Sequence, residues 1–150
     1  MRHLISIYEY IIAEGRWGHV GAGILPYCTK TNKFLISLRS RYVLEPNTWN
    51  LWGGKIEDVD ETVERSALRE FREETGYNGQ IKLIKSYIYK EKNFTYYNFI
   101  GIVNNEFIPN LDWETQDFKW MSLDDLIKLE PKHFGLKSLL DNNLNQLKKL

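Results

Sequence analysis

Residues 53–77 read GGKIEDVDETVERSALREFREETGY, and this stretch decides how the whole chain is interpreted. The glycine pair Gly53-Gly54 ends a long connection, and a charged amphipathic segment follows. Glycine permits close backbone approach, and helical residues advance by about 100° each, so we expect a turn and then a helix over residues 61–75. Gly76 is a typical residue at a helix C-terminus.

The expected helix carries glutamates on the side that should face the core. Val63, Ala67 and Phe71 form one apolar stripe, and Glu70 and Glu74 fall on the same side. Like charges at these spacings destabilise a helix by about a few tenths of a kcal/mol per pair. The helix dipole also disfavours anions in the C-terminal half. A divalent cation would offset both effects, because Mg²⁺ binds carboxylate oxygens together with phosphates.

A helix of this composition can also turn its glutamates to water, beside Arg65, Arg69 and Arg72. The surrounding residues favour the metal, because the stretch resembles the Nudix box, G-x5-E-x7-R-E-U-x-E-E-x-G-U, with U a bulky apolar residue. Glu61 is followed by seven residues and then by REFREETGY at 69–77, which matches the second half in full. In the first half, six residues separate Gly54 from Glu61 instead of five, which we interpret as a one-residue bulge in the loop.

The resemblance implies one Nudix hydrolase domain over residues 1–150, of the α+β class, with a mixed β-sheet between helices in an α/β/α sandwich. The apolar patterns predict strands that alternate with turns, at residues 19–27, 34–39, 81–90, 94–103 and 117–121. Ser122 is expected to cap a helix, and a last helix is expected over residues 136–150. The pattern at residues 3–13 does not distinguish a strand from a short helix.

The resemblance also implies a metal site. In Nudix hydrolases the R-E-U-x-E-E segment binds divalent metal, which makes Glu70, Glu73 and Glu74 the expected ligands, with the carbonyl of Gly53 as a further one. The expected cofactor is Mg²⁺, with Mn²⁺ as a possible substitute. The reaction it implies is attack of a metal-activated water on a phosphoanhydride bond.

A proton acceptor for that water can come from several positions. Glu70 or Glu73 could serve within the helix, and Glu114 stands where some family members carry a glutamate in a later loop. The resemblance gives Glu61 and Arg69 a structural role as an ion pair that fixes the loop against the helix, since such a pair is geometrically rigid.

Four further residues are candidates for binding the substrate. Arg39 and Arg41 end an expected strand and enter the long connection, and Lys55 follows the glycine pair, so each could reach a phosphate. Tyr97 could stack on a base. Surface arginines and a core tyrosine are the competing interpretations.

The bulk composition limits the class of substrate. Lys plus Arg and Asp plus Glu number 20 each, which gives a formal net charge of +0 and argues against binding of duplex nucleic acid. A small or short substrate is favoured, and the family resemblance implies that it is a nucleotide. The single cysteine, Cys28, cannot form a disulfide framework or a zinc site. The sequence contains no run of 18 apolar residues, so no membrane span and a cytoplasmic location are expected. The protein is expected to be a monomer or a homodimer.

Two other functions share the expected fold. A Nudix-fold nucleotide-binding or regulatory module that has lost catalysis would be expected to lack one of the three glutamates of the REFREE segment, and all are present here. An isomerase of isopentenyl diphosphate would need an additional reactive cysteine in a long insert. The substrate stays open among (d)NTPs and nucleoside diphosphate derivatives.

Overall fold

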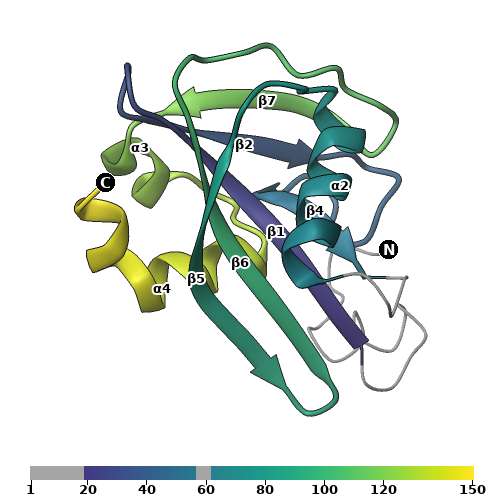
Figure 1. The fold of residues 1–150 in the computed structure, drawn as a ribbon. Coiled ribbons are helices and arrows are strands. Elements are labelled where there is room, and N and C mark those ends of the chain that lie inside the picture. Colours follow the sequence, from purple (N-terminus) through teal and green to yellow (C-terminus); the bar gives the residue numbers. More distant parts are fainter. Residues whose placement is uncertain (1–18, 57–61) are drawn as a thin grey trace.

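The computed structural model describes residues 19–56 and 62–150, so the uncertain segment at residues 3–13 and the predicted role of Glu61 lie outside the described residues. Figure 1 shows the arrangement of strands and helices. In chain order the elements are β1 (His19–Cys28), β2 (Lys33–Arg39), β3 (Trp49–Asn50), β4 (Trp52–Lys55), α2 (Val63–Thr75), β5 (Lys82–Glu91), β6 (Phe94–Val103), β7 (Thr115–Met121), α3 (Leu123–Lys128) and α4 (Phe134–Lys148).

The sheet is mixed, and its central pair is parallel. The strand order is β3-β2-β1-β6-β5, with β4 paired to β1 and β7 paired to β2. β1 and β6 run parallel along their whole length, from His19 opposite Phe94 to Cys28 opposite Val103. β5 and β6 form the predicted antiparallel pair, with a register shift between Lys85 and Ile88.

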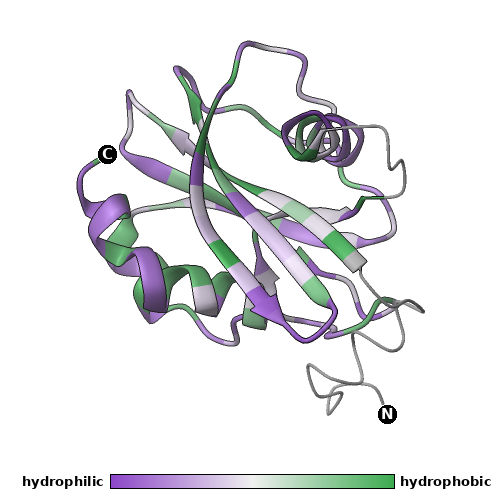
Figure 2. Cartoon of the chain, turned by 60° about the horizontal axis from the view of Figure 1, so that its bottom comes forward, coloured by the Kyte–Doolittle hydropathy of each residue, from purple (hydrophilic) through white to green (hydrophobic). Residues whose placement is uncertain are grey.

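Helices cover both faces of the sheet, which confirms the predicted α+β class. α2 lies on one face, and α3 and α4 lie on the other (Figures 1 and 2). Ala67 and Phe71 of α2 pack into a cluster with Trp52 and Phe99. A second cluster joins the opposite face to α3 and α4, through residues such as Leu126 and the leucines of α4. The alternation of side chains along each strand divides them between the two clusters.

Local signals at the helix ends explain where the helices begin and end. Thr62 accepts a hydrogen bond from the Arg65 N–H at 3.2 Å, so α2 begins at Val63, two residues later than the first residue of the predicted helix. Gly76 adopts the left-handed conformation, with φ of 73°, and its N–H donates to the Arg72 carbonyl. Ser122 caps α3 as predicted.

The structure also differs from the predicted elements elsewhere in the chain. The long connection after β2 contains the short strands β3 and β4, which are too short to produce a recognisable alternation. β7 begins at Thr115 and not at residue 117, and α4 begins at Phe134 because His133 caps it. No helix in the described part of the chain is long and apolar enough to cross a membrane.

Candidate active site

A cleft of about 770 Å³ opens between the helix α2, the glycine-rich β4 and the start of α4. One part, which we call the acidic end, is lined by Glu70, Glu74 and Glu114. The other part, which we call the aromatic end, is lined by Tyr89, Phe94, Tyr96 and Phe134. The strands β1, β4 and β6 form the floor between the two ends.

Glu74 is the most unusual residue of the acidic end. Its Oε1 atom is buried and has no hydrogen-bond partner among the described residues. Burial raises the pKa of Glu74 well above its ordinary value, and the nearby charges of Glu70, Glu114 and Asp112 raise it further, while Arg39 opposes the shift. An anion held in this place needs a positive partner, because an unpaired buried charge is strongly unfavourable.

Glu114 reaches the acidic end from the loop before β7. The Ser40 N–H donates to the Glu114 carbonyl at 2.9 Å, which ties this loop to the end of β2. The Glu114 N–H donates to Oδ1 of Asp112, a local turn that fixes the backbone. Burial and then Asp112 raise the pKa of Glu114, and Arg39 lowers it. The structure therefore brings Glu114 to the predicted glutamates of α2.

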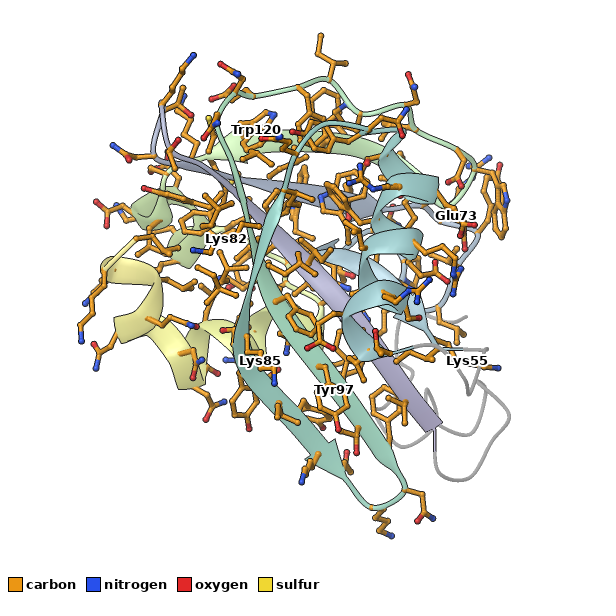
Figure 3. The ribbon with its side chains drawn as sticks, viewed as in Figure 1. Lys55, Glu73, Lys82, Lys85, Tyr97 and Trp120 are labelled. Atoms are coloured by element: carbon orange, nitrogen blue, oxygen red, sulfur yellow. The ribbon has the colours of Figure 1, made fainter. Side chains whose placement is uncertain are left out.

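Glu73 does not share this environment. Its side chain is 61% exposed and accepts a hydrogen bond from Arg69 at 3.1 Å, whereas Glu70 is 19% exposed and lies 3.6 Å from the same guanidinium. Glu73 is not among the described residues that line the cleft; Figure 3 shows it on α2. The predicted pairing of Arg69 with Glu61 falls outside the described residues.

The glycine pair lets β4 pass between β1 and α2. A Cβ atom at Gly53 would lie 2.2 Å from the Ala22 carbonyl oxygen and 2.6 Å from the Tyr96 hydroxyl. A Cβ atom at Gly54 would lie 3.3 Å from Oε2 of Glu70. The first glycine therefore faces β1 and the aromatic end, and the second faces the acidic end.

Arg39 lies between the loop after β2 and the acids. Its guanidinium donates to the carbonyls of Leu44 and Glu45, at 2.8 and 3.3 Å from Nε. Its charge also acts on Glu74 and Glu114. Arg39 lines the cleft, and its hydrogen bonds hold the 40–47 loop; its predicted contact with a substrate phosphate stays a prediction.

The two other predicted cations also line the cleft. Arg41 is exposed, lies over the ring of Tyr42 at 4.9 Å and donates to its hydroxyl at 2.8 Å. Lys55 extends outward from β4 (Figure 3). Arg41 is exposed and Lys55 is half-buried.

The two neighbouring tyrosines of β6, of which Tyr97 is the predicted base-stacking residue, differ in their place relative to the cleft. Tyr96 lines the cleft, whereas Tyr97 packs against the cluster under α2 and does not line the cleft (Figure 3). Successive side chains of a strand point to opposite faces, so Phe94, Tyr96 and Asn98 share the cleft side of β6. The sequence did not indicate which of the two faces of the sheet at β6 would line the cleft.

Sequence reasoning gave no role to several cleft residues, among them Asn50, Asn98 and His133. Burial lowers the pKa of His133 well below its ordinary value, and Arg39 lowers it further, so the imidazole is neutral. Its Nδ1 accepts a hydrogen bond from the Gly135 N–H at 3.0 Å, which places the ring proton on Nε2. The only sequence signal for Asn50 and Asn98 is an amide in an otherwise apolar or aromatic strand.

Comparison with known protein families identifies the family that has this fold and site. The model of the NUDIX domain matches residues 17–142 of the chain. The chain belongs to the Nudix family. The comparison with curated proteins found no match.

Solved structures share the Nudix fold of this chain. An Ap4A hydrolase from C. elegans, in a binary complex, is 25% identical, with a TM-score of 0.66 over 88% of this chain and 99% of that chain. The Nudix hydrolase RenU from M. smegmatis has a TM-score of 0.73 at 20% identity, covering 89% and 86%. The MutT protein from Methanosarcina mazei Go1 has a TM-score of 0.64 at 23% identity, covering 87% and 93%.

Family membership and the preserved fold make the chain a Nudix pyrophosphohydrolase. Nudix hydrolases generally use divalent metals, and the residues present fit such an ion. The buried Oε1 of Glu74 is a hard oxygen donor with no other partner among the described residues, and Glu70 adds a second carboxylate beside it. Within residues 19–56 and 62–150, however, no three His, Cys, Asp or Glu side chains already form a group able to hold a metal.

Proposed function

We propose that this Nudix hydrolase cleaves the phosphoanhydride bond of a nucleoside diphosphate derivative or a (d)NTP, and that it requires Mg²⁺, with Mn²⁺ as a substitute. The observation that carries the proposal is the carboxylate of Glu74, buried in the cleft without a hydrogen-bond partner among the described residues and beside Glu70. Such a carboxylate is stable only when protonated or when a cation neutralises it. Ap4A hydrolase, a relative at 25% identity, supports a nucleotide with a pyrophosphate linkage.

The ligand set would be Glu70, Glu73, Glu74 and the carbonyl of Gly53. When bound, the ion neutralises the anhydride oxygens and lowers the pKa of water. Glu73 reaches the set only by leaving Arg69, 3.1 Å away. An exposed ion pair between residues four apart on a helix contributes only about 0.3–0.5 kcal/mol, so this release costs little.

Glu114 is the proton acceptor that we favour over Glu70 and Glu73. It lines the cleft, its backbone is fixed by Ser40 and Asp112, and its pKa is raised. A general base works best when its pKa approaches the working pH. Arg41 and Lys55 would bind the phosphate chain at the open side of the cleft, and Arg39 would hold the 40–47 loop beside it.

The test is turnover of a substrate panel by the full chain. The protein is incubated with Mg²⁺, Mn²⁺ or EDTA and with (d)NTPs, ADP-ribose, nucleotide sugars, dinucleoside polyphosphates or capped RNA, and the products are separated by ion-exchange chromatography. We expect metal-dependent release of pyrophosphate or of a nucleoside monophosphate from at least one class. Binding without turnover of any of them would favour the alternative, a catalytically lapsed module. The NUDIX domain of NrtR from Shewanella oneidensis, which is complexed with ADP ribose, is a precedent for a bound nucleotide on this fold.

A further inference from the structure

Two buried amide oxygens in the cleft have no role in the chemistry described above. Oδ1 of Asn98 and Oδ1 of Asn50 are both buried, and neither has a hydrogen-bond partner among the described residues. The two residues are 2% and 8% exposed and line the same cleft. A buried acceptor without a donor costs about 1–3 kcal/mol, so two of them in one cleft call for a physical explanation.

The orientation of the Asn98 amide is fixed by a local irregularity of the sheet. The register of β5 against β6 shifts between Lys85 and Ile88, and Tyr87 lies in this stretch. Its carbonyl accepts a hydrogen bond from Nδ2 of Asn98 at 2.9 Å. Because that carbonyl requires a donor, the nitrogen must face it, and the oxygen of Asn98 must be the atom left for another partner. A register shift of this kind is a β-bulge, and β-bulges commonly change the direction of side chains near functional sites.

Asn50 lies on the short strand β3, where α4 begins. Its backbone carbonyl accepts a hydrogen bond from the Ser37 hydroxyl at 3.1 Å, which holds the strand in place. A Cβ atom at Gly135 would lie 3.3 Å from Oδ1 of Asn50, so the absent side chain at Gly135 keeps the surroundings of this oxygen open.

Aromatic rings surround the same part of the cleft. The ring of Phe134 lies 4.3 Å from that of His133 and 5.8 Å from that of Tyr89, and Phe94 lies 6.4 Å from Tyr89. All four residues line the cleft. Flat apolar walls favour a planar ring, because aromatic stacking stabilises a bound base by about 1–3 kcal/mol. The acidic end, in contrast, is suited to the phosphates.

We propose that the aromatic end is a base-recognition subsite that selects a nucleotide whose base carries an exocyclic amino group, through Oδ1 of Asn98 and Oδ1 of Asn50. An amino group offers two N–H donors and no good acceptor, so it can satisfy one or both oxygens. A keto oxygen in the same place would bring its lone pairs against those of the amide oxygens. The buried acceptors would then stay without a hydrogen-bond donor. The inference rests on the proposed function, because it assumes that the cleft binds a nucleotide.

The test compares nucleotides that differ at one ring substituent. The full chain is assayed with ATP against ITP, with CTP against UTP, and with ATP against purine riboside triphosphate, which lacks the amino group. We expect kcat/KM to favour the amino member of at least one matched pair by about 10- to 100-fold, the loss expected when a buried acceptor goes unsatisfied. Turnover of every pair within a factor of three overturns the inference and leaves the proposed function intact.

A binding experiment separates failure of the two proposals. If no triphosphate is hydrolysed, isothermal titration calorimetry with AMP, IMP, CMP and UMP measures selection without any anhydride bond. A preference for AMP over IMP or for CMP over UMP then supports the subsite although the proposed function has failed. Equal affinities, or no measurable binding of any of the four, overturn the subsite.

Two variants locate the selection. Asn98→Leu, which keeps the branched shape of the side chain and removes the amide, should bring the amino-to-keto ratio close to one. Asn50→Ala should lower the ratio and leaves the bond between Asn98 and Tyr87 untouched, so it tests the subsite even if Asn98→Leu does not fold. Asn78→Leu, at an exposed position outside the cleft lining, is the matched control and should keep the full ratio. An unchanged ratio in Asn50→Ala and in folded Asn98→Leu overturns the assignment.

Discussion

Both ends of the cleft contain buried polar groups without partners, but the two ends need different kinds of partner. At the acidic end the unsatisfied atom belongs to a carboxylate on α2, and it requires a cation. At the aromatic end two amide oxygens, on β3 and β6, have no hydrogen-bond partner among the described residues, and they require N–H donors. In the two proposals, bond cleavage and substrate selection therefore rest on separate elements of the fold. Mutations should therefore change the two properties independently.

The largest effect is expected at the acidic end. Glu74→Gln keeps the shape of the side chain and removes its charge, so kcat should fall by about 10²- to 10³-fold, the range seen when one electrostatic stabiliser is removed from an active site. Glu64→Gln changes an exposed glutamate in the first turn of the same helix and should leave kcat unchanged. Steady-state kinetics with the best substrate of the panel measures both. Equal activity of the two variants would show that Glu74 is not part of the metal site.

Alanine substitutions at Gly53 and Gly54 test how β4 packs between the acidic end and the aromatic end of the cleft. Gly53→Ala places a methyl group 2.2 Å from a backbone oxygen of β1, which cannot move aside, so the free energy of unfolding should drop by about 1–3 kcal/mol. Gly54→Ala meets only the carboxylate of Glu70, at 3.3 Å, so it should lower kcat more than stability. Urea denaturation and steady-state kinetics distinguish these outcomes. Identical denaturation midpoints for the two variants would contradict the packing described for β4.

A smaller effect is expected at the aromatic end. Phe134→Leu removes a stacking surface and should raise KM by about 10-fold with little change in kcat, consistent with about 1–3 kcal/mol per stacked base. Phe107→Leu removes a ring that stacks on Tyr77 at 4.2 Å, under α2 and outside the cleft lining, and should leave KM unchanged. A fall in kcat without a change in KM for Phe134→Leu would place this residue with the chemistry and not with selection.

The smallest expected effect concerns pH. The pKa values of Glu74 and Glu114 are raised in the folded protein above the ordinary 4.5. The folded state therefore holds these protons more tightly than the unfolded state. Their contribution to the stability of the metal-free protein is full below about pH 4.5 and is lost as the pH rises through the raised values.

The pH effect is isolated by comparing the wild type with Glu74→Gln. In EDTA the variant should become the more stable protein as the pH rises through the raised pKa of Glu74, and its Tm should exceed that of the wild type there. Mg²⁺ should reverse the order, because it binds the wild-type carboxylate. Thermal denaturation monitored by circular dichroism at several pH values measures the difference. A difference in Tm that does not vary with pH would contradict the raised pKa of Glu74.

The sequence predicted α2 well because the signals for this helix are local. The spacing of Val63, Ala67 and Phe71 sets its buried face, and Gly76 ends it. The same periodicity places Glu70 and Glu74 beside the core, where the structure has them. The position of Glu114 at the acidic end came from the family resemblance and not from any local pattern.

The aromatic end could not be predicted because it is assembled from distant segments. Asn50, Asn98 and His133 are isolated polar residues whose sequence neighbours do not indicate a common cleft. The alternation along β6 separates Tyr96 from Tyr97, but which of them faces the cleft depends on where α4 packs. The strands β3 and β4 form because β1 and β2 offer hydrogen-bonding edges, and strands of two and four residues carry no period of their own.

The parallel pairing of β1 with β6 also sets the order in which the protein can be made. Each residue of β1 pairs with one 75 positions later, as His19 does with Phe94. Closing so long a loop is slow, and folding of such non-local pairings lags behind that of local ones. During synthesis the glutamates of α2 leave the ribosome before β6, the central strand with which β1 must pair.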